Sequence, residues 1–325
     1  MWEIFFDTLR QVLVMLFFIA VGYFMRRKNL LPQESAKTLS SLITNFILPA
    51  YVIYNLSSSI TIGGLKEYGT YILCGLVCLA IFLAIAFGLA TVMKKTFSEK
   101  ALLIYMLAFS NYSYFGYPLI ESVYGPQTLS SVLIFVIPFT VFIYTAGVYM
   151  IAPRDKKEIG KNGKKRKFKI QPVVIAIVIG IALGLLGVNM QGSSEDFALA
   201  SIGNILCIAK SCMSPLSMLL TGIVLAKYSL KELFKSWKAA IIAFVRLAVI
   251  PMLVLGLCLL FRLATNLHGA QYLLIPVVIS AMPIGMNIVV FRENDGAESA
   301  QVNFLSLLMS IATIPLLFMF LQYLV

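Results

Sequence analysis

Two stretches of polar and helix-breaking residues interrupt segments that are otherwise apolar. The first, SNYSYFGYPL (residues 110–119), contains Asn111, Ser113, Tyr114, Gly116 and Pro118, and the second, AMPIGMN (281–287), contains Pro283, Gly285 and Asn287. Proline removes a backbone donor and kinks a helix, which frees main-chain groups. The N–H groups at the start of a half-helix attract an anion, and side-chain amides both donate and accept hydrogen bonds. Carbonyl oxygens freed at a break can instead coordinate Na⁺. We therefore expect these residues to bind a solute, either a carboxylate or, alternatively, Na⁺.

Each of these residues also has a purely structural explanation. Amides in membrane helices hydrogen-bond across packed interfaces, and proline is common in such helices. Tyr112, Tyr114 and Tyr117 can line a pocket for an organic anion, but aromatic packing explains them equally well. Because both amides, Asn111 and Asn287, lie beside the interruptions, we favour a site over a packing role.

Few charged residues lie inside the apolar segments, and each of them suggests a function. Lys210 either pairs with an anionic substrate or extends toward the membrane surface as a packing residue. Arg246 pairs with a carbonyl or an acid in the core, or reaches the headgroups, and a structural role is favoured. Glu121 is the carboxylate nearest the first interruption and is a candidate for proton coupling. Asn45 is a second candidate for ion coupling.

The sequence lacks the residues that several other activities need. The single histidine, His268, falls in a loop, so neither a His-based catalytic triad nor a His/Cys metal site can be assembled. Neither a phosphate-cradling GxxxxGKS/T motif nor a dinucleotide GxGxxG motif occurs, which excludes ATP-driven pumping by this chain alone. The five cysteines have no metal-type or disulfide spacing. We predict a protein that is not an enzyme and needs no cofactor.

Composition places these residues in a membrane protein. Hydrophobic residues make up 60% of the chain and charged residues only 12%, which is more apolar surface than a soluble domain can bury. The net charge of +12 is concentrated in loops on one side, so we expect no nucleic-acid partner. The N-terminus carries Glu3 and Asp7 where a cleavable signal peptide would be basic, and we expect the first apolar segment to be retained.

The apolar segments approach the ~20 residues that a bilayer core requires. We predict ten spans, at residues 4–25, 38–56, 68–93, 101–123, 129–151, 171–189, 198–226, 239–262, 271–291 and 298–324. Most basic residues lie in the loops after the odd-numbered segments, above all in the loop 153–170. By the positive-inside rule this predicts a multi-pass cell-membrane protein with both termini outside the cytoplasm and the basic middle loop inside.

The loop 153–170 separates two sets of segments, in residues 1–152 and 171–325. Because each set has an odd number of spans, the second is inserted upside down relative to the first. Interruptions fall in corresponding segments, in the fourth and ninth and also at Asn45 to Pro49 in the second and at Ser214-Pro215 in the seventh. Matching interruptions in inverted repeats are typical of the solute site of a secondary transporter, and chance placement of prolines is the alternative.

At these positions the chain resembles the auxin efflux carrier family, which includes plant PIN-type auxin carriers and bacterial organic-acid permeases. The resemblance rests on the order and spacing of several motifs, none of which is specific alone. The motifs are Val21-Gly22-Tyr23-Phe24, Asn45 to Pro49, Asn111 with Phe115-Gly116-Tyr117-Pro118-Leu119 and Tyr124-Gly125, Pro215 to Ala226, Arg246-Leu247 with Pro251, and Pro283 to Asn287 with Phe291-Arg292-Glu293.

The resemblance implies an all-α, ten-helix inverted-repeat fold related to bile-acid and sodium/proton antiporter structures. Helices 1, 2, 6 and 7 would form a scaffold that often dimerises, and helices 3–5 and 8–10 a mobile transport domain. Helices 4 and 9 would cross at their breaks, where the family binds organic anions, with Asn111 at the crossover asparagine and Pro118 and Pro283 at the crossover prolines. Lys210 departs from the family pattern, and the third segment lacks a buried acid, which leaves the coupling ion open.

We therefore expect a secondary transporter of small organic anions, such as malate, malonate or auxin-like acids, that works by alternating access of the elevator type. The resemblance makes a homodimer the expected assembly. The energy source stays open between coupling to H⁺ or Na⁺ and the membrane potential. The direction of transport, import or export, stays open as well. A membrane sensor on the same fold, or a channel, is the alternative, although residues 153–169 look too short and too uniformly basic for a signalling platform.

Overall fold

The computed structural model describes residues 2–93, 97–147, 150, 171–191, 196–264, 269–285 and 296–324. Within these ranges the chain forms helices joined by short turns and contains no β-strand. One isolated antiparallel bridge joins Ser110 to Ile284. The all-helical class predicted from the apolar segments is confirmed. The basic loop 153–170, His268 and Asn287 lie outside the described residues.

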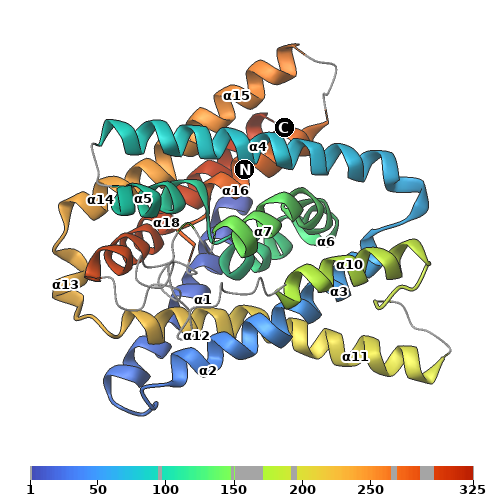
Figure 1. Cartoon of the computed structure of the whole chain (residues 1–325), viewed down its shortest axis with the longest axis horizontal. Coiled ribbons are helices and arrows are strands. Elements are labelled where there is room, and N and C mark those ends of the chain that lie inside the picture. The colour runs from blue at the N-terminus through green and yellow to red at the C-terminus, as the bar shows by residue number, and fades with distance from the viewer. Residues whose placement is uncertain are drawn as a thin grey trace, which may run out of the picture.

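The helices follow the predicted apolar segments along the chain (Figure 1). Before the middle loop they are α1 (Trp2–Arg27), α2 (Ser35–Leu42), η1 (Ile43–Ile47), α3 (Leu48–Ser59), η2 (Ile62–Gly64), α4 (Leu65–Val92), α5 (Phe97–Ala108), η3 (Tyr112–Gly116), α6 (Tyr117–Phe135), α7 (Ile137–Phe142) and η4 (Ile143–Gly147). After it they are α10 (Pro172–Leu185), α11 (Phe197–Ser211), α12 (Met213–Leu225), α13 (Leu230–Phe234), α14 (Trp237–Phe244), η5 (Val245–Val249), α15 (Ile250–Ala264), α16 (Ala270–Ala281) and α18 (Gly296–Leu324). Here η2 is a 3₁₀ turn and the other η elements are π turns.

Several helical runs are long and apolar enough to cross a membrane. Among the described residues there are six, namely Trp2–Arg27, Ser35–Ser59, Ile62–Val92, Phe197–Leu225, Trp237–Leu263 and Glu298–Leu324. A seventh candidate is the pair Tyr112–Phe135 and Ile137–Gly147, which bends by 48°. The shorter apolar helices Pro172–Leu185 and Gln271–Ala281 coincide with the sixth and ninth predicted segments. A multi-pass membrane protein is thus supported, whereas the number of ten spans stays a prediction.

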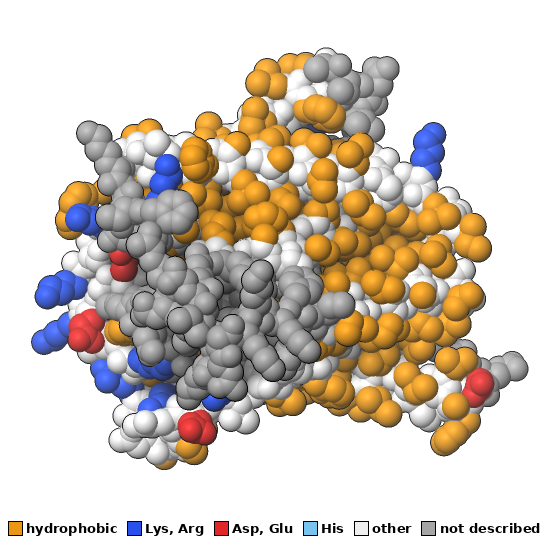
Figure 2. Space-filling view, in the orientation of Figure 1, with side chains coloured by type: hydrophobic (Ala, Val, Ile, Leu, Met, Phe, Trp, Pro, Cys, Tyr) orange, Lys and Arg blue, Asp and Glu red, His pale blue; other side chains and the backbone are white. Residues whose placement is uncertain are grey.

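The molecular surface is suited to lipid. Large apolar side chains such as Phe17, Ile208 and Leu260 are more than half exposed. Figure 2 shows hydrophobic side chains over much of the visible face, while Lys and Arg gather toward the end that carries α13 in Figure 1. Soluble proteins rarely expose apolar patches of this extent, but a bilayer core removes them from water.

Two glycines allow α1 and α12 to approach each other closely. A Cβ atom at Gly22 would overlap the carbonyl oxygen of Leu219, and one at Gly222 would overlap the carbonyl oxygen of Ile19. Small residues at such positions are typical of helix interfaces in membranes. Elsewhere α3 packs against α10 and α11, α4 packs against α5, α6 and α7, and α18 packs against α1 and α14.

The second and seventh segments continue through their predicted breaks. In the second, the π turn η1 leads directly into α3, where Pro49 is in the first turn. In the seventh, Cys212 has helical dihedrals and α12 starts at the next residue, so Pro215 is also in a first turn. Both places are irregular, with a π turn before Pro49 and a one-residue gap between α11 and α12 before Pro215. At Asn45–Pro49 and Ser214-Pro215 the structure therefore has irregular helix where we expected a break.

Gly125 marks the boundary between the fourth and fifth predicted segments. It lies within α6 with φ 81° and ψ 173°, a backbone conformation that residues other than glycine rarely adopt, and Pro126 follows it. The chain therefore turns at Gly125, and the run 117–135 comprises the end of one apolar segment and the start of the next.

Candidate functional site

The fourth segment is interrupted by non-helical backbone at residues 109–111, where Asn111 has φ −81° and ψ 51°. α5 ends at Ala108, and the π turn η3 begins at Tyr112 without a side-chain cap. Pro118 lies after the interruption, in a helix that runs without a gap from the π turn η3 into α6. The break that we assigned to Pro118 lies instead at residues 109–111.

The ninth segment is interrupted by extended backbone at residues 282–285. α16 ends at Ala281, and Met282 has φ −68° and ψ 149°. Pro283 follows, and a residue before proline is pushed toward extended conformations. Here the proline does coincide with the end of the helix. Asn287, the amide that we predicted for this half of the site, lies outside the described residues.

The two interruptions pair with each other, and we call the paired stretches 109–111 and 283–285 the bridge. The N–H of Asn111 donates to the carbonyl oxygen of Pro283 at 2.7 Å, and the N–H of Gly285 donates to that of Phe109 at 3.3 Å. These four main-chain groups therefore satisfy one another and are not open to a solute, because each break supplies partners that the other needs.

A stripe of buried polar residues on α18 holds the bridge from one side. Ser306 Oγ accepts from the N–H of Ile284 at 3.2 Å, and Asn303 Nδ2 donates to the Ile284 carbonyl oxygen at 2.9 Å. Ser299 and Ser310 lie on the same face and are also buried. We did not single out these residues, although their spacing along an apolar helix, at i, i+4, i+7 and i+11, is the signal that identifies one polar face.

Two side-chain groups of the bridge itself lack a partner within the described residues. Ser110 Oγ and Asn111 Nδ2 are both buried and make no hydrogen bond there, and beside them the acceptor Asn303 Oδ1 is also unpaired. The N–H groups of the first turn of η3, which starts one residue later, have no side-chain cap and have no intrahelical acceptors. A buried polar group without a partner costs about 1–3 kcal/mol, so these donors are well placed to bind a ligand. Ser110 is a residue that our reasoning from the sequence did not select.

A narrow cavity lies beside the bridge. Its volume is only about 20 Å³. That is room for about one ordered water. The lining residues include Ser110, Asn111, Tyr112, Ser113, Tyr117, Thr140, Tyr144 and Gly285, together with apolar side chains of α3 and α10. An organic anion therefore requires the surrounding helices to move apart.

The candidate residues of the two interruptions fall into three groups. Asn111, Ser113 and Gly285 line the same cavity. Pro283 contributes its carbonyl oxygen to the bridge, and Gly116 leaves room for the side chain of Met282, whose Cγ would lie 3.3 Å from a Cβ there. Tyr114 and Pro118 do not line the cavity. A role in substrate binding stays a prediction for all of them.

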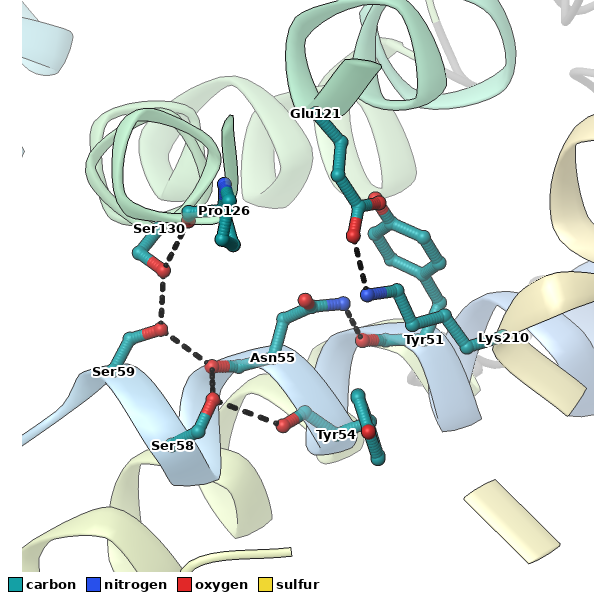
Figure 3. Close-up of polar contacts among 9 residues, drawn as sticks. All are labelled: Tyr51, Tyr54, Asn55, Ser58, Ser59, Glu121, Pro126, Ser130 and Lys210. Atoms are coloured by element: carbon teal, nitrogen blue, oxygen red, sulfur yellow. Dashed lines mark hydrogen bonds and ion pairs between the residues drawn. The ribbon is translucent and has the colours of Figure 1, made fainter. Parts of the chain in front are cut away.

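Lys210 and Glu121 form an ion pair between α11 and α6 (Figure 3). Lys210 Nζ lies 2.6 Å from Glu121 Oε1, and the hydroxyl of Tyr51 donates to Glu121 Oε2 at 3.3 Å. Lys210 Nζ also lies 5.2 Å from the centre of the Tyr54 ring, within cation–π range. Thus the protein itself supplies a carboxylate for Lys210. Direct binding of substrate by Lys210 and proton coupling through Glu121 stay predictions.

Asn45 points away from the cavity. Its side chain is exposed, and Nδ2 donates to the carbonyl oxygen of Ser41 at 2.8 Å and to Ser41 Oγ at 3.0 Å. This is a bond to its own helix, one turn back. Its role as an ion-coupling residue stays a prediction.

Arg246 is completely buried in the π turn η5. Its Nη1 donates to the carbonyl oxygen of Leu107 at 3.0 Å, in the last turn of α5, while Nε and Nη2 have no partner in the part of the chain that the structure describes. Of the alternatives that the sequence left for Arg246, pairing with a carbonyl is the one observed.

The comparison with protein families is consistent with this architecture. A family model described as membrane transport protein matches residues 7–320, nearly the whole chain. The chain belongs to this family. The resemblance to the auxin efflux carriers that we noted from the motifs is thereby confirmed.

Relatives of this membrane transport protein carry transporter names. It is 22% identical over 287 residues to the uncharacterized transporter YfdV of Escherichia coli K12, covering 85% of this chain and 83% of that protein. It is 24% identical over 223 residues to the uncharacterized transporter MJ1031 of Methanocaldococcus jannaschii, covering 68% of this chain and 70% of that protein. Family and relatives together indicate a membrane transporter.

Proposed function

We propose that this membrane transport protein is a secondary transporter of small organic anions and that the substrate carboxylate binds at the bridge. The observation that carries the proposal is the pair of buried, unpartnered groups there, Ser110 Oγ and Asn111 Nδ2, which line the cavity. A hydroxyl and an amide N–H both donate to a carboxylate, and such charge-assisted hydrogen bonds are stronger than neutral ones.

The start of η3 adds to the attraction for an anion. Its first N–H groups point toward the bridge end of the helix and carry the positive end of the helix dipole. The aromatic rings of Tyr112 and Tyr117 line the same cavity, which favours substrates with an apolar part beside the carboxylate. Malate, malonate and auxin-like acids are the substrate classes that we propose.

The transport cycle follows from the architecture that we propose, two inverted sets of five helices in 1–152 and 171–325, joined by the basic loop 153–170. Helices 1, 2, 6 and 7 are the scaffold, and helices 3–5 and 8–10 are the transport domain, in which helices 4 and 9 cross at the bridge. Packing of α3 on α10 and α11, and of α1 on α12, supports the scaffold, and packing of α4 on α5 and α6 supports the transport domain. The cavity is too tight for substrate, so the scaffold and the transport domain must shift relative to each other in an elevator-type cycle.

Orientation, energy source and assembly complete the proposal. Both termini lie outside the cytoplasm and loop 153–170 inside, which the gathering of Lys and Arg at one end of the molecule supports (Figure 2). Transport is driven by H⁺, by Na⁺ or by the membrane potential, with Glu121 as the proton candidate. The unit is a homodimer that contacts through its scaffold.

Ligand-induced thermal stabilisation of the purified protein tests the site. Dicarboxylates, keto acids and indole acids are added singly, with and without Na⁺, because a ligand of the folded state raises apparent stability by mass action. We expect at least one carboxylate to stabilise the protein, and we expect Asn111→Ala to weaken its binding by about tenfold, which equals 1.4 kcal/mol. Thr91→Ala, which removes an exposed hydroxyl that donates to the Phe87 carbonyl oxygen of its own helix, is the control and leaves the affinity unchanged.

Two outcomes contradict the proposal. One is that no carboxylate stabilises the wild-type protein and none is transported by it into liposomes. The other is a carboxylate that binds the Asn111→Ala variant as tightly as the wild type, which would move the site away from the bridge.

A further inference from the structure

Arg246 carries a charge into the centre of a membrane-spanning helix. It lies in η5, within the span Trp237–Leu263, and is 0% exposed. Burying a guanidinium away from water costs several kcal/mol unless a counter-charge or hydrogen bonds compensate for it, and intramembrane charges usually serve a function.

The compensation that Arg246 receives within the described residues is partial. Nη1 donates to the Leu107 carbonyl oxygen at 3.0 Å, while Nε and Nη2 make no bond. The ion pairs in this part of the structure join other residues, Arg10 to Asp7 and Lys210 to Glu121. Among the described residues, Arg246 therefore has no acidic partner, and its Nε and Nη2 stay free to donate.

The position of this charge relates it to the bridge. Leu107 lies in the last turn of α5, and the non-helical stretch 109–111 starts two residues later. η5 packs against α5, α16 and α18, which are the helices that end at the bridge or hold it. The last carbonyls of a helix carry the negative end of its dipole, so Arg246 neutralises the end of α5 that faces the bridge.

This neutralisation decides which ion the bridge favours. Freed carbonyls at a broken membrane helix can coordinate Na⁺, whereas helix starts attract anions. The guanidinium of Arg246 places a positive charge at the carbonyl end of α5. The N–H groups in the first turn of η3 add a second, partial positive charge on the other side of the interruption. The local field then favours an anion at Ser110 and Asn111.

We propose that Arg246 is a built-in counter-cation that takes the place of a coupling metal ion at the end of α5 and sets the preference of the bridge for a carboxylate. This inference rests on the proposed function and deepens it. Arg246 acts as a positioning and specificity residue, because it is not among the residues that line the cavity. Substrate binding at the bridge then needs no Na⁺.

Variants that separate charge from hydrogen bonding test the inference. Arg246→Lys keeps a positive charge, and Arg246→Gln keeps an N–H donor for the Leu107 carbonyl without the charge. Arg262→Ala is the matched control, since Arg262 is a partly buried arginine whose Nη1 donates at 3.4 Å to another helix-end carbonyl, that of Leu324. Uptake of the carboxylate identified above is measured in proteoliposomes, in Na⁺ or choline buffer, and thermal unfolding of each variant is followed in parallel.

Three results are expected. Wild-type uptake is the same in Na⁺ and in choline. Arg246→Gln raises KM by about tenfold or more with little change in Vmax, and Arg246→Lys raises it less. A further variant, Arg246→Ala, loses uptake, and millimolar guanidinium in the buffer restores part of it. Arg262→Ala transports like the wild type, and guanidinium does not change its uptake.

The inference is overturned if the wild type takes up the carboxylate only with Na⁺, or if Arg246→Gln keeps the wild-type KM and only its unfolding temperature falls. In either case the protein still transports a carboxylate, so the proposed function survives. A wild-type protein that binds no carboxylate would instead refute the proposed function itself.

Discussion

The main-chain N–H of Asn111 donates a 2.7 Å hydrogen bond to the carbonyl oxygen of Pro283, in the opposite half of the sequence. Two broken helices are thus joined where each has lost its own helical partners. Because the backbone groups of the bridge satisfy each other, we propose that the side chains of Ser110 and Asn111 and the first N–H groups of η3 recognise the solute.

Ser110→Ala is predicted to weaken ligand binding without weakening the fold. Its hydroxyl is buried and unpartnered, so its removal takes away a donor for the ligand and also an unsatisfied group. We expect affinity for the carboxylate to fall by about five- to tenfold and the unfolding temperature of the free protein to stay the same or rise.

Ser306→Ala is the control for that prediction. Ser306 Oγ accepts from the N–H of Ile284 and donates to the Asn303 carbonyl oxygen, so its loss leaves buried groups unpaired and lowers stability by about 1–3 kcal/mol. Both variants are compared by thermal unfolding with and without ligand. A lower unfolding temperature for free Ser110→Ala would show that its hydroxyl has a structural partner.

The ion pair between Lys210 and Glu121 is predicted to act as a unit. Lys210→Met and Glu121→Gln each leave one charge unpaired in a partly buried setting, so we expect each to lower stability and the double variant to lower it less than the sum. The side chains of Lys210 and Glu121 are 17% and 30% exposed, so solvent screening limits the coupling free energy between them to about 1 kcal/mol.

The affinities of the two single variants and the double variant for the carboxylate separate two roles of Lys210. If its role is to pair with Glu121, the double variant recovers most of the affinity for the carboxylate. An affinity that stays as low in the double variant as in Lys210→Met would mean that Lys210 contacts the substrate, as the sequence suggested.

Gly222→Ala is predicted to disrupt the contact between α1 and α12. The new Cβ would overlap the carbonyl oxygen of Ile19, a backbone atom that cannot move aside without shifting the helix. Overpacking of this kind costs about 1–3 kcal/mol or more. Gly88→Ala on α4, where a Cβ meets nothing within 4 Å, is expected to unfold at the wild-type temperature or above. Equal unfolding temperatures for the two variants would contradict the close packing.

The sequence was sufficient for the membrane class and for the regions of the two interruptions, because both follow from hydropathy and from clusters of Asn, Ser, Gly and Pro. The residue at which a helix breaks was harder to predict. Pro49 and Pro118 follow π turns inside continuous helices and Pro215 follows the short gap between α11 and α12, whereas Pro283 follows a true helix end. Proline alone does not distinguish these cases.

The partners of the candidate residues could not be predicted from the sequence. Lys210 and Glu121 were singled out for separate roles, yet they pair with each other from helices far apart in the chain. Ser110 was missed because serine in an apolar segment usually bonds to its own helix, and only the non-helical backbone at the bridge leaves its hydroxyl free.

Carboxylate binding by Asn111→Asp tests most directly whether the bridge is an anion site. The substitution keeps the size of the side chain and replaces the free N–H donor with a negative charge beside the bound carboxylate. Measured by ligand-induced thermal stabilisation and confirmed by uptake, affinity is predicted to fall by about tenfold or more, since like charges repel strongly in a site shielded from water. A variant that binds the carboxylate as tightly as the wild type, or more tightly, would contradict the account.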